Sequence, residues 1–243
     1  MSSKNVLRIS KYILLTLVFS ICLSFCSKKE KKHLFILSGQ SNMELLRPEE
    51  SFTPILNEKF GENNVIVVKF AKGTQPIRRW YKDWKPKEGD EPKAEPYLYD
   101  SLLIRVKKAI HKKEIESVTF VWMQGERDAR KGHGNVYEQS LLGLYNQLSK
   151  DLNRKDMNFI IGRLSDFGLI KKGWPDWEMI RDIQVKVGES NPKFGWINTD
   201  DLNQGINRNG KKVKDDIHMS VKGYVIMGER FAKKAINLIE NNK

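Results

Sequence analysis

Cysteine is nearly absent from this chain of 243 residues, which has two, and none follows Cys26. The part of the chain after that residue therefore has no disulfide and no thiolate metal site, whatever the redox state of its compartment. Histidine is also scarce, because only four occur: His33, His111, His133 and His218. The length and the lack of an internal repeat predict a single folded domain.

Acidic side chains are outnumbered, with 30 Asp and Glu against 43 Lys and Arg and a formal net charge of +13. Such a balance suits nucleic acid, an anionic cell envelope or an acidic glycan as a partner. Many lysines are scattered at expected helix ends and turns, which is typical of a solvated surface: Lys107, Lys108, Lys112, Lys113, Lys171, Lys172, Lys211 and Lys212. No nucleic-acid motif accompanies them, so we predict no nucleic-acid partner and leave the other two open.

The one long apolar run, Tyr12–Phe25, follows three basic residues, Lys4, Arg8 and Lys11. This run is too short for a comfortable membrane span and is typical of a secretory signal. Without those three charges the formal net charge falls from +13 to +10. An exported protein is also a poor candidate for binding nucleic acid.

Cys26 directly follows the apolar run, and Leu23–Cys26 resembles a bacterial lipobox. Cys26 is therefore the predicted lipidated residue, although Phe25 stands where the processing peptidase favours a small residue. We predict a lipoprotein-type signal peptide over 1–25, a charged tether over 26–32 and the folded domain over 33–243. The protein is then exported and lipid-anchored to the membrane of a bacterial cell envelope. Ordinary cleavage nearby and an uncleaved anchor are the alternatives.

Apolar runs alternate with amphipathic segments along the rest of the chain. Strands are expected at His33–Leu37, Val65–Phe70, Val118–Trp122, Phe159–Gly162 and Gly195–Asn198. Their near-continuous apolar character suits a parallel sheet that is buried on both faces. Helical stripes occupy Leu98–Lys112, Val136–Leu152 and a segment from Val221 onward. This order predicts an α/β fold, a three-layer α/β/α sandwich.

Two stretches, Lys82–Pro96 and Ile170–Trp177, break this rhythm and are expected to be loops. They carry Trp84, Trp174 and Trp177. These side chains either stack on a sugar ring beside an active site or plug the surface of the domain, and the sequence leaves both open.

The most informative stretch is Gly39-Gln40-Ser41-Asn42, directly after the first expected strand. A strand that runs into a small-residue turn presents a serine as a nucleophile above the edge of the sheet in α/β enzymes. The alternative is an ordinary turn in which Ser41 or Asn42 caps the next helix.

Near the other end of the chain, Asp215 and His218 stand three residues apart before the last expected helix. A serine needs a base to take its proton, and a histidine needs an acceptor to fix its tautomer. We prefer Asp215 to Asp216 because an Asp-x-x-His spacing lets the carboxylate reach one ring nitrogen while the other faces the serine. The alternative is a helix-capping aspartate beside a surface His218. Together with Ser41 the pattern predicts a catalytic triad.

Four blocks, in this order, resemble SGNH-type (GDSL-like) hydrolases in the branch of sialate O-acetylesterases and carbohydrate acetylesterases. They are Ser38–Met43, Gly73-Thr74 with Ile77 and Trp80, Trp122–Glu126 with Asp128, and Thr199–Leu202 leading to Asp215–Ser220 and Gly223. The resemblance runs from about His33 to the end of the last helix. It implies a flavodoxin-like sheet of five parallel strands and a serine esterase that removes O-acetyl groups from carbohydrate through an acyl-enzyme.

The oxyanion formed in such a reaction needs preorganised hydrogen-bond donors. The predicted donors are the backbone N–H groups of Ser41 and Gly73 and the side-chain amide of Gln124. Glycine at position 73 lets the backbone approach the oxyanion closely. No metal or organic cofactor is expected.

The substrate pocket is predicted to include Asn42, Glu44, Arg78, Glu126 and Arg127. Arg127 stands where this branch usually has a small residue, which predicts a contact with solvent or with an acidic group of the substrate. Glu126 with Asp128 has the composition of a glycosidase carboxylate pair, but a supporting role near Gln124 is preferred.

The predicted partner is an acetylated glycan, and two other functions stay open. A glycan O-acetyltransferase would use a sugar hydroxyl in place of water, and a non-catalytic envelope protein would only bind glycan on the same fold. The chain has no multi-span membrane segment of the kind that often supplies an acyl donor, and no triad residue is missing. The glycan, the acyl group and the oligomeric state are not determined by the sequence.

Overall fold

Five parallel strands form the central sheet in the order β2-β1-β3-β4-β5. Their bounds are β1 Lys32–Gly39, β2 Val65–Ala71, β3 Ile115–Met123, β4 Asn158–Gly162 and β5 Phe194–Ile197. These come from a computed structural model, which describes residues 31–169 and 171–241. The strand order is that of flavodoxin-like folds. The predicted α/β fold with a five-stranded parallel sheet is confirmed.

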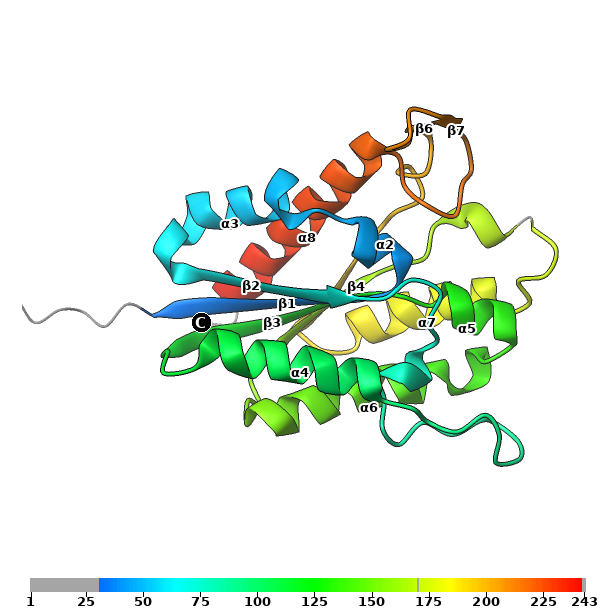
Figure 1. Ribbon diagram of the computed structural model, residues 1–243, viewed down its shortest axis with the longest axis horizontal. Helices are drawn as coiled ribbons and strands as arrows, with labels where there is room; N and C mark the ends of the chain where they lie inside the picture. The colour runs from blue at the N-terminus through cyan, green and yellow to red at the C-terminus, as the bar shows by residue number, and fades with distance from the viewer. Residues whose placement is uncertain (1–30, 170, 242–243) are drawn as a thin grey trace, which may run out of the picture. The chain divides into compact units, whose positions relative to one another are not determined.

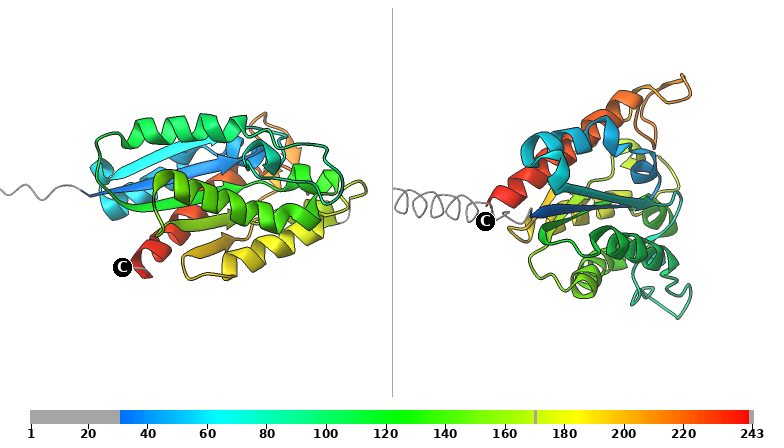
Figure 2. Two further views of the ribbon diagram at one scale, coloured as in Figure 1. Left: turned by 90° about the horizontal axis from the view of Figure 1, so that it is seen from below. Right: turned by 60° about the vertical axis from the view of Figure 1, so that its left-hand side comes forward.

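Helices cover both faces of this sheet (Figures 1 and 2). Their bounds are α2 Ser41–Leu45, α3 Phe52–Phe60, α4 Tyr97–Ile110, α5 Glu126–Lys131, α6 Gly134–Leu152, α7 Trp177–Glu189 and α8 Val221–Asn241. Within the described residues, the 3₁₀ turns are η1 Pro48–Glu50, η2 Glu62–Asn64, η3 Ile77–Arg79 and η4 Asp166–Leu169. A small antiparallel pair, β6 Gly205–Ile206 with β7 Lys212–Val213, lies between β5 and α8.

The side chains of β1 alternate between two separate apolar clusters, because successive residues of a strand face opposite sides of the sheet. Leu34 and Ile36 belong to the cluster packed against α4, α6 and α7. Phe35 and Leu37 belong to the cluster packed against α3 and α8. A strand with apolar residues on both faces is what a doubly covered parallel sheet requires, so the run that predicted β1 is explained by its position inside the sheet, between β2 and β3.

The tryptophans of the two irregular stretches are mostly buried. Trp84 is 3% exposed and Trp177 is 1% exposed, while Trp174 packs against Trp177 and Phe167. These rings therefore plug the surface of the domain and do not form a sugar-stacking platform. Helices α3 and α7 were not expected from the sequence.

The predicted signal peptide, Cys26 and most of the predicted tether lie outside the described residues. Lys32, the last residue of the expected tether, is the first residue of β1. In the described part of the chain, no helix is long and apolar enough to cross a membrane.

The carboxyl ends of the strands gather the predicted site residues. Ser41 follows β1, Gly73 follows β2 and Gln124 follows β3. Figure 1 shows α2, α5 and the β6–β7 pair at the end of the molecule toward which the strand arrows point. Ligands of open α/β sheets bind at this edge, so the fold brings segments distant in sequence to one place.

Candidate active site

The turn between β1 and α2 places Ser41 at the edge of the sheet. Gly39 has φ 143°, and a Cβ there would lie 2.0 Å from the carbonyl oxygen of Met123 at the end of β3. The next residue, Gln40, donates its N–H to that same carbonyl at 3.0 Å. Only glycine fits at position 39 so close to Met123. The hydrogen bond of Gln40 then fixes the turn to the end of β3. Ser41 is the first residue of α2, and its N–H has no partner within the helix.

His218 reaches Ser41 from the opposite end of the domain. The Nε2 atom of His218 lies 3.0 Å from Oγ of Ser41, a hydrogen-bonding distance across 177 positions of the chain. The His218 side chain is 43% exposed, so the pair is open to solvent and to a substrate. This is the geometry that a serine nucleophile and its general base require.

The carboxylate beside the imidazole belongs to Asp216 and not to Asp215. Oδ1 of Asp216 lies 3.9 Å from Nδ1 of His218 and accepts the backbone N–H of His218 at 2.9 Å. Asp215 has φ 49° and an exposed side chain that makes no hydrogen bond or ion pair with His218. The left-handed backbone at Asp215 is a turn feature that the Asp-x-x-His spacing does not reveal. The geometry therefore differs from the expected assignment of the triad acid.

Asn42 connects the turn that carries Ser41 to the loop that carries His218, here called the histidine loop. Its Nδ2 donates to Oε1 of Glu126 at 2.9 Å and to the carbonyl of Ile217 at 3.0 Å. Its Oδ1 accepts the hydroxyl of Tyr224 at 3.0 Å. Asn42 is 1% exposed, so this predicted pocket residue instead holds the residue before His218 in place.

Gly73 lies against Ser41, as its predicted role as an oxyanion donor requires. A Cβ at this position would lie 3.5 Å from Cβ of Ser41. Its N–H, however, donates to Oε2 of Glu44 at 2.8 Å. Glu44 stands on α2, one turn after Ser41, and Lys72 lies 3.9 Å from its other oxygen. The N–H of Gly73, which we predicted as an oxyanion donor, is therefore already hydrogen-bonded to the carboxylate of Glu44.

Gln124 is not placed as an oxyanion donor. It is fully buried, and its Nε2 already contacts Oδ2 of Asp128 at 2.5 Å, the carbonyl of Gln75 at 3.2 Å and Oε1 of Gln40 at 3.3 Å. The Gln124 amide thus holds the turn at Gln40 and the segment after β2 at Gln75. This geometry does not support its predicted role in the oxyanion hole. Sequence spacing could not show that its hydrogens are used internally.

The sequence pattern does not mark Gln40 as a candidate for a role in the site. Its Oε1 accepts from Gln124 and from the backbone N–H of Arg127 at 3.2 Å, which fixes the orientation of its amide. Its Nε2 has no acceptor among the residues that the structure describes. A free amide donor therefore directly precedes Ser41 in sequence.

The two carboxyl groups of α5 are buried inside the protein. Glu126 is 1% exposed and Asp128 is fully buried. Asp128 accepts the N–H of Ile77 at 2.9 Å as well as the Gln124 amide, and His133 lies 3.5 Å away. Neither is arranged as a glycosidase carboxylate flanking an open site. Burial raises the pKa of Glu126 to about 7, although its hydrogen bond from Asn42 acts in the opposite direction.

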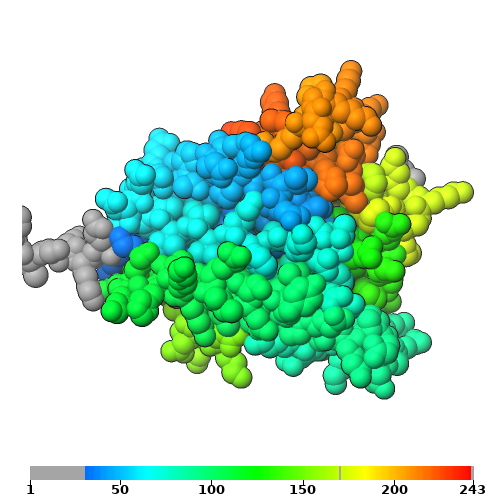
Figure 3. Space-filling view, in the orientation of Figure 1, coloured from blue at the N-terminus to red at the C-terminus, as the bar shows by residue number. Residues whose placement is uncertain are grey.

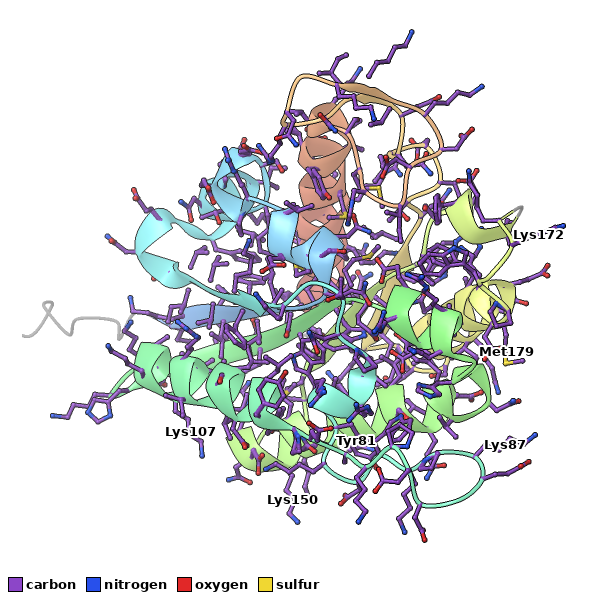
Figure 4. The ribbon with its side chains drawn as sticks, turned by 45° about the vertical axis from the view of Figure 1, so that its right-hand side comes forward. Tyr81, Lys87, Lys107, Lys150, Lys172 and Met179 are labelled. Atoms are coloured by element: carbon purple, nitrogen blue, oxygen red, sulfur yellow. The ribbon has the colours of Figure 1, made fainter. Side chains whose placement is uncertain are left out.

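Arg78 and Arg127, the remaining predicted pocket residues, line a single hollow of about 520 Å³ beside this site. In the space-filling view α2, the segment after β2 and α5 lie side by side at the surface (Figure 3). Other cations are placed differently: Lys87, Lys107, Lys150 and Lys172 project outward at the periphery (Figure 4), as expected of a solvated surface. Within residues 31–169 and 171–241, no three His, Cys, Asp or Glu side chains are grouped to hold a metal ion.

Residues 44–237 match the model of a family described as carbohydrate esterase, sialic acid-specific acetylesterase. The chain belongs to this family. It is therefore a carboxylic ester hydrolase, and the family supports esterase activity on the acetyl groups of carbohydrate. His218 lies within the matched residues, and Ser41 lies just before them. A comparison with curated protein sequences gave no match.

Solved structures share the fold of this esterase. A protein from Arabidopsis thaliana has a TM-score of 0.61 at 17% identity, over 85% of this chain and 98% of its own. A carbohydrate acetylesterase from Xanthomonas citri has a TM-score of 0.62 at 16% identity, over 84% of this chain and 56% of its own. The structure of NanS has a TM-score of 0.61 at 11% identity, over 88% of this chain and 99% of its own.

Proposed function

We propose that this esterase removes acetyl groups from carbohydrate with Ser41 as nucleophile and His218 as general base. The observation that carries the proposal is the 3.0 Å distance between Nε2 of His218 and Oγ of Ser41. His218 takes the hydroxyl proton as Ser41 attacks the ester carbonyl, and it then protonates the departing sugar hydroxyl. Water hydrolyses the acetyl-enzyme with His218 again acting as base, which releases acetate.

We assign Asp216 as the group that orients the imidazole, because its carboxylate is the one beside Nδ1. For the oxyanion we assign the N–H groups of Ser41 and Gly73 and the free amide of Gln40. The donor of Gly73 becomes available only when the carboxylate of Glu44 moves away. Substrate binding therefore includes a small rearrangement of the Glu44 side chain.

The test is acetate release from acetylated oligosaccharides and turnover of p-nitrophenyl acetate by the wild type and two serine variants. Ser41→Ala should abolish both activities without changing the circular dichroism spectrum, because the side chain lies at the end of the sheet. Ser101→Ala is the matched control, since that hydroxyl donates to its own helix α4. Residual turnover of more than a few per cent in folded Ser41→Ala would exclude it as the nucleophile.

We also propose that the mature protein is anchored in a cell envelope by lipid on Cys26, which follows the apolar run Tyr12–Phe25. Two or three acyl chains hold a protein firmly on a membrane, whereas one chain binds weakly. The wild type should incorporate labelled palmitate and sediment with membranes, and Cys26→Ala should do neither. A wild type without label, together with a variant that still sediments, would show that Phe25 prevents lipidation.

A further inference from the structure

One aromatic side chain, that of Tyr97, lies open on the surface near the candidate active site. Tyr97 is 50% exposed. Within residues 31–169 and 171–241, every other Phe, Tyr and Trp is buried or half-buried. Trp84 and Trp177, which the sequence offered as sugar-stacking rings, are among the buried ones. Tyr97 is therefore the ring on which a ligand can stack.

The protein holds this ring in a defined orientation. The guanidinium carbon of Arg79 lies 5.2 Å from the centroid of the Tyr97 ring, a cation–π contact that covers one face. Arg79 pairs with Glu95, and the other oxygen of that carboxylate pairs with Arg78 at 2.5 Å. Tyr97 is the first residue of α4, and its N–H donates to the carbonyl of Glu95 at 3.0 Å. A ring fixed on one face loses little conformational freedom when a ligand stacks on the open face.

A hollow of about 520 Å³ connects this ring to the candidate active site. We call it the basic hollow, because four residues in its walls are cationic: Arg78, Arg79, Arg127 and Lys131. Thr74, also in its walls, directly follows Gly73, and a Cβ at Gly73 would lie 3.5 Å from Cβ of Ser41. Arg79, the residue that covers Tyr97, belongs to the same walls. The basic hollow thus extends from beside Ser41 to the arginine under the ring.

The basic hollow suits a sugar. Its volume lies within the range of pockets that hold small ligands, roughly 300–1,000 Å³. A hydroxyl, an amide and an imidazole in its walls can pair with sugar hydroxyls: Thr74, Gln75 and His133. The Cα atoms of Gly73 and Arg79 are at most about 20 Å apart, since six residues of extended chain reach no further. A short oligosaccharide covers that span, whereas a single sugar at the ester-binding end leaves Tyr97 free.

We infer that Tyr97 forms a distal subsite that stacks on a sugar ring of the glycan chain, so that the esterase prefers acetylated oligosaccharides to acetylated single sugars. The inference rests on the proposed function, because the subsite acts only on a glycan whose ester is held at Ser41. The apolar face of a pyranose ring fits on the open face of the tyrosine, while the hydroxyls at its edge stay in water. Such a contact is the same before and during the chemical step, so it lowers KM and leaves kcat unchanged.

The experiment follows acetate release from a neutral series, xylose and its β-1,4-linked oligosaccharides up to the hexasaccharide, each with one acetyl group on the same terminal sugar. Neutral sugars keep charge out of the comparison. For the wild type, KM should fall by roughly three- to tenfold from the monosaccharide to the longer members, as expected for one aromatic contact. In Tyr97→Ala this fall should shrink to less than about twofold.

Two further variants separate stacking from other effects. Tyr97→Phe keeps a ring and should keep the fall in KM. Ile104→Ala is the matched control, because Ile104 lies on the same helix, is 69% exposed and does not line the basic hollow. It should also keep the fall. KM does not depend on how much of a preparation is folded, so a partly unfolded variant still gives a result.

A wild-type KM that is the same for the whole series would overturn the inference, as would a fall in KM that survives in Tyr97→Ala. Failure of the proposed function looks different. In that case no member of the series releases acetate, or Ser41→Ala retains the hydrolysis of p-nitrophenyl acetate.

Discussion

Ser41 lies on a turn whose backbone is bonded to the central sheet, whereas His218 lies in the long connection between β5 and α8. The turn is pinned where Gln40 donates to Met123 and where Gly39 leaves no room for a Cβ. The loop that carries His218 is held from α2 by Asn42, which donates to the Ile217 carbonyl, whereas its backbone bonds, such as Asp216 N–H to the Asn203 carbonyl, lie within the same connection. Bonds to the central sheet thus position Ser41, whereas a few polar contacts position His218. Substitutions in the turn at Ser41 should therefore lower the stability of the fold, whereas substitutions in the histidine loop should lower activity.

The largest effect is expected from Gly39→Ala. The new Cβ would lie 2.0 Å from the Met123 carbonyl oxygen in a backbone conformation that alanine avoids. Overpacking and strain together should lower the free energy of unfolding by roughly 3–5 kcal/mol. Urea unfolding followed by circular dichroism measures this. A variant of normal stability that has merely lost activity would show that the turn is less rigid than the structure indicates.

In the histidine loop, Asp216→Asn should preserve the fold while lowering kcat/KM for a small ester by roughly 10²–10⁴-fold, as loss of an orienting carboxylate does elsewhere. The asparagine keeps an oxygen that can accept the His218 N–H, so the loop should stay in place. Asp215→Asn is the matched control and should change kcat/KM by no more than a few-fold. The opposite ranking would assign the triad acid to Asp215, as the Asp-x-x-His spacing predicts.

The side-chain amides of Gln40 and Gln124, both near Ser41, are expected to differ in the property that they support. Gln40→Ala should lower kcat by roughly 10²–10³-fold with little change in KM, because an oxyanion bond strengthens only in the transition state. Gln124→Ala should instead reduce stability by leaving the buried Asp128 and Tyr137 groups short of partners. Steady-state kinetics together with urea unfolding separate the two. If Gln124→Ala is as stable as the wild type and loses only kcat, Gln124 is an oxyanion donor, as the sequence predicts.

Glu126 accepts a hydrogen bond from Asn42, which links the turn at Ser41 to the histidine loop. The pH dependence of the unfolding free energy tests its buried state. Its pKa is about 7 in the folded chain against an ordinary value of 4.5, because the carboxyl is buried. The folded state therefore keeps a proton that the unfolded state loses. This contribution to stability is full below about pH 4.5 and is lost as the pH rises toward 7.

Relative to the wild type, Glu126→Gln should therefore gain about 3 kcal/mol of unfolding free energy between pH 4.5 and pH 8. The glutamine oxygen can still accept the Asn42 amide. Urea unfolding across this range gives the difference, and exposed Glu178→Gln serves as control. A difference that stays flat with pH would mean that the folded Glu126 titrates at its ordinary value.

The smallest effect is expected from Glu44→Ala, which frees the Gly73 N–H from a half-exposed carboxylate. Because exposed charged contacts contribute little, kcat/KM for p-nitrophenyl acetate should rise by a factor of about 5 at most. A fall in activity would show that Glu44 orders the segment after β2 for catalysis and does not compete with the oxyanion.

Local patterns along the chain were enough to predict the strands of the central sheet and to mark Ser41 and His218 as a pair. Apolar runs long enough to be buried on both faces identified all five strands, because such runs have few other stable positions. Ser41 after the first strand and His218 before the last helix followed from local patterns, and the structure brings them within 3.0 Å. Helix α3 was not expected because its apolar stripe is short: only Phe52 and Leu56 are buried in it.

Which polar atoms lie beside the imidazole and which are used in internal hydrogen bonds could be read only from the folded chain. Spacing favoured Asp215 and Gln124, but a left-handed turn leaves Asp216 beside the imidazole, and a buried network uses the hydrogens of Gln124. The basic hollow likewise combines residues from three separate segments, including Arg78 and Arg127. A sequence pattern records which groups are present along the chain. Hydrogen-bond partners and charge compensation depend on distances of a few ångströms between segments far apart in sequence, and only folding sets those distances.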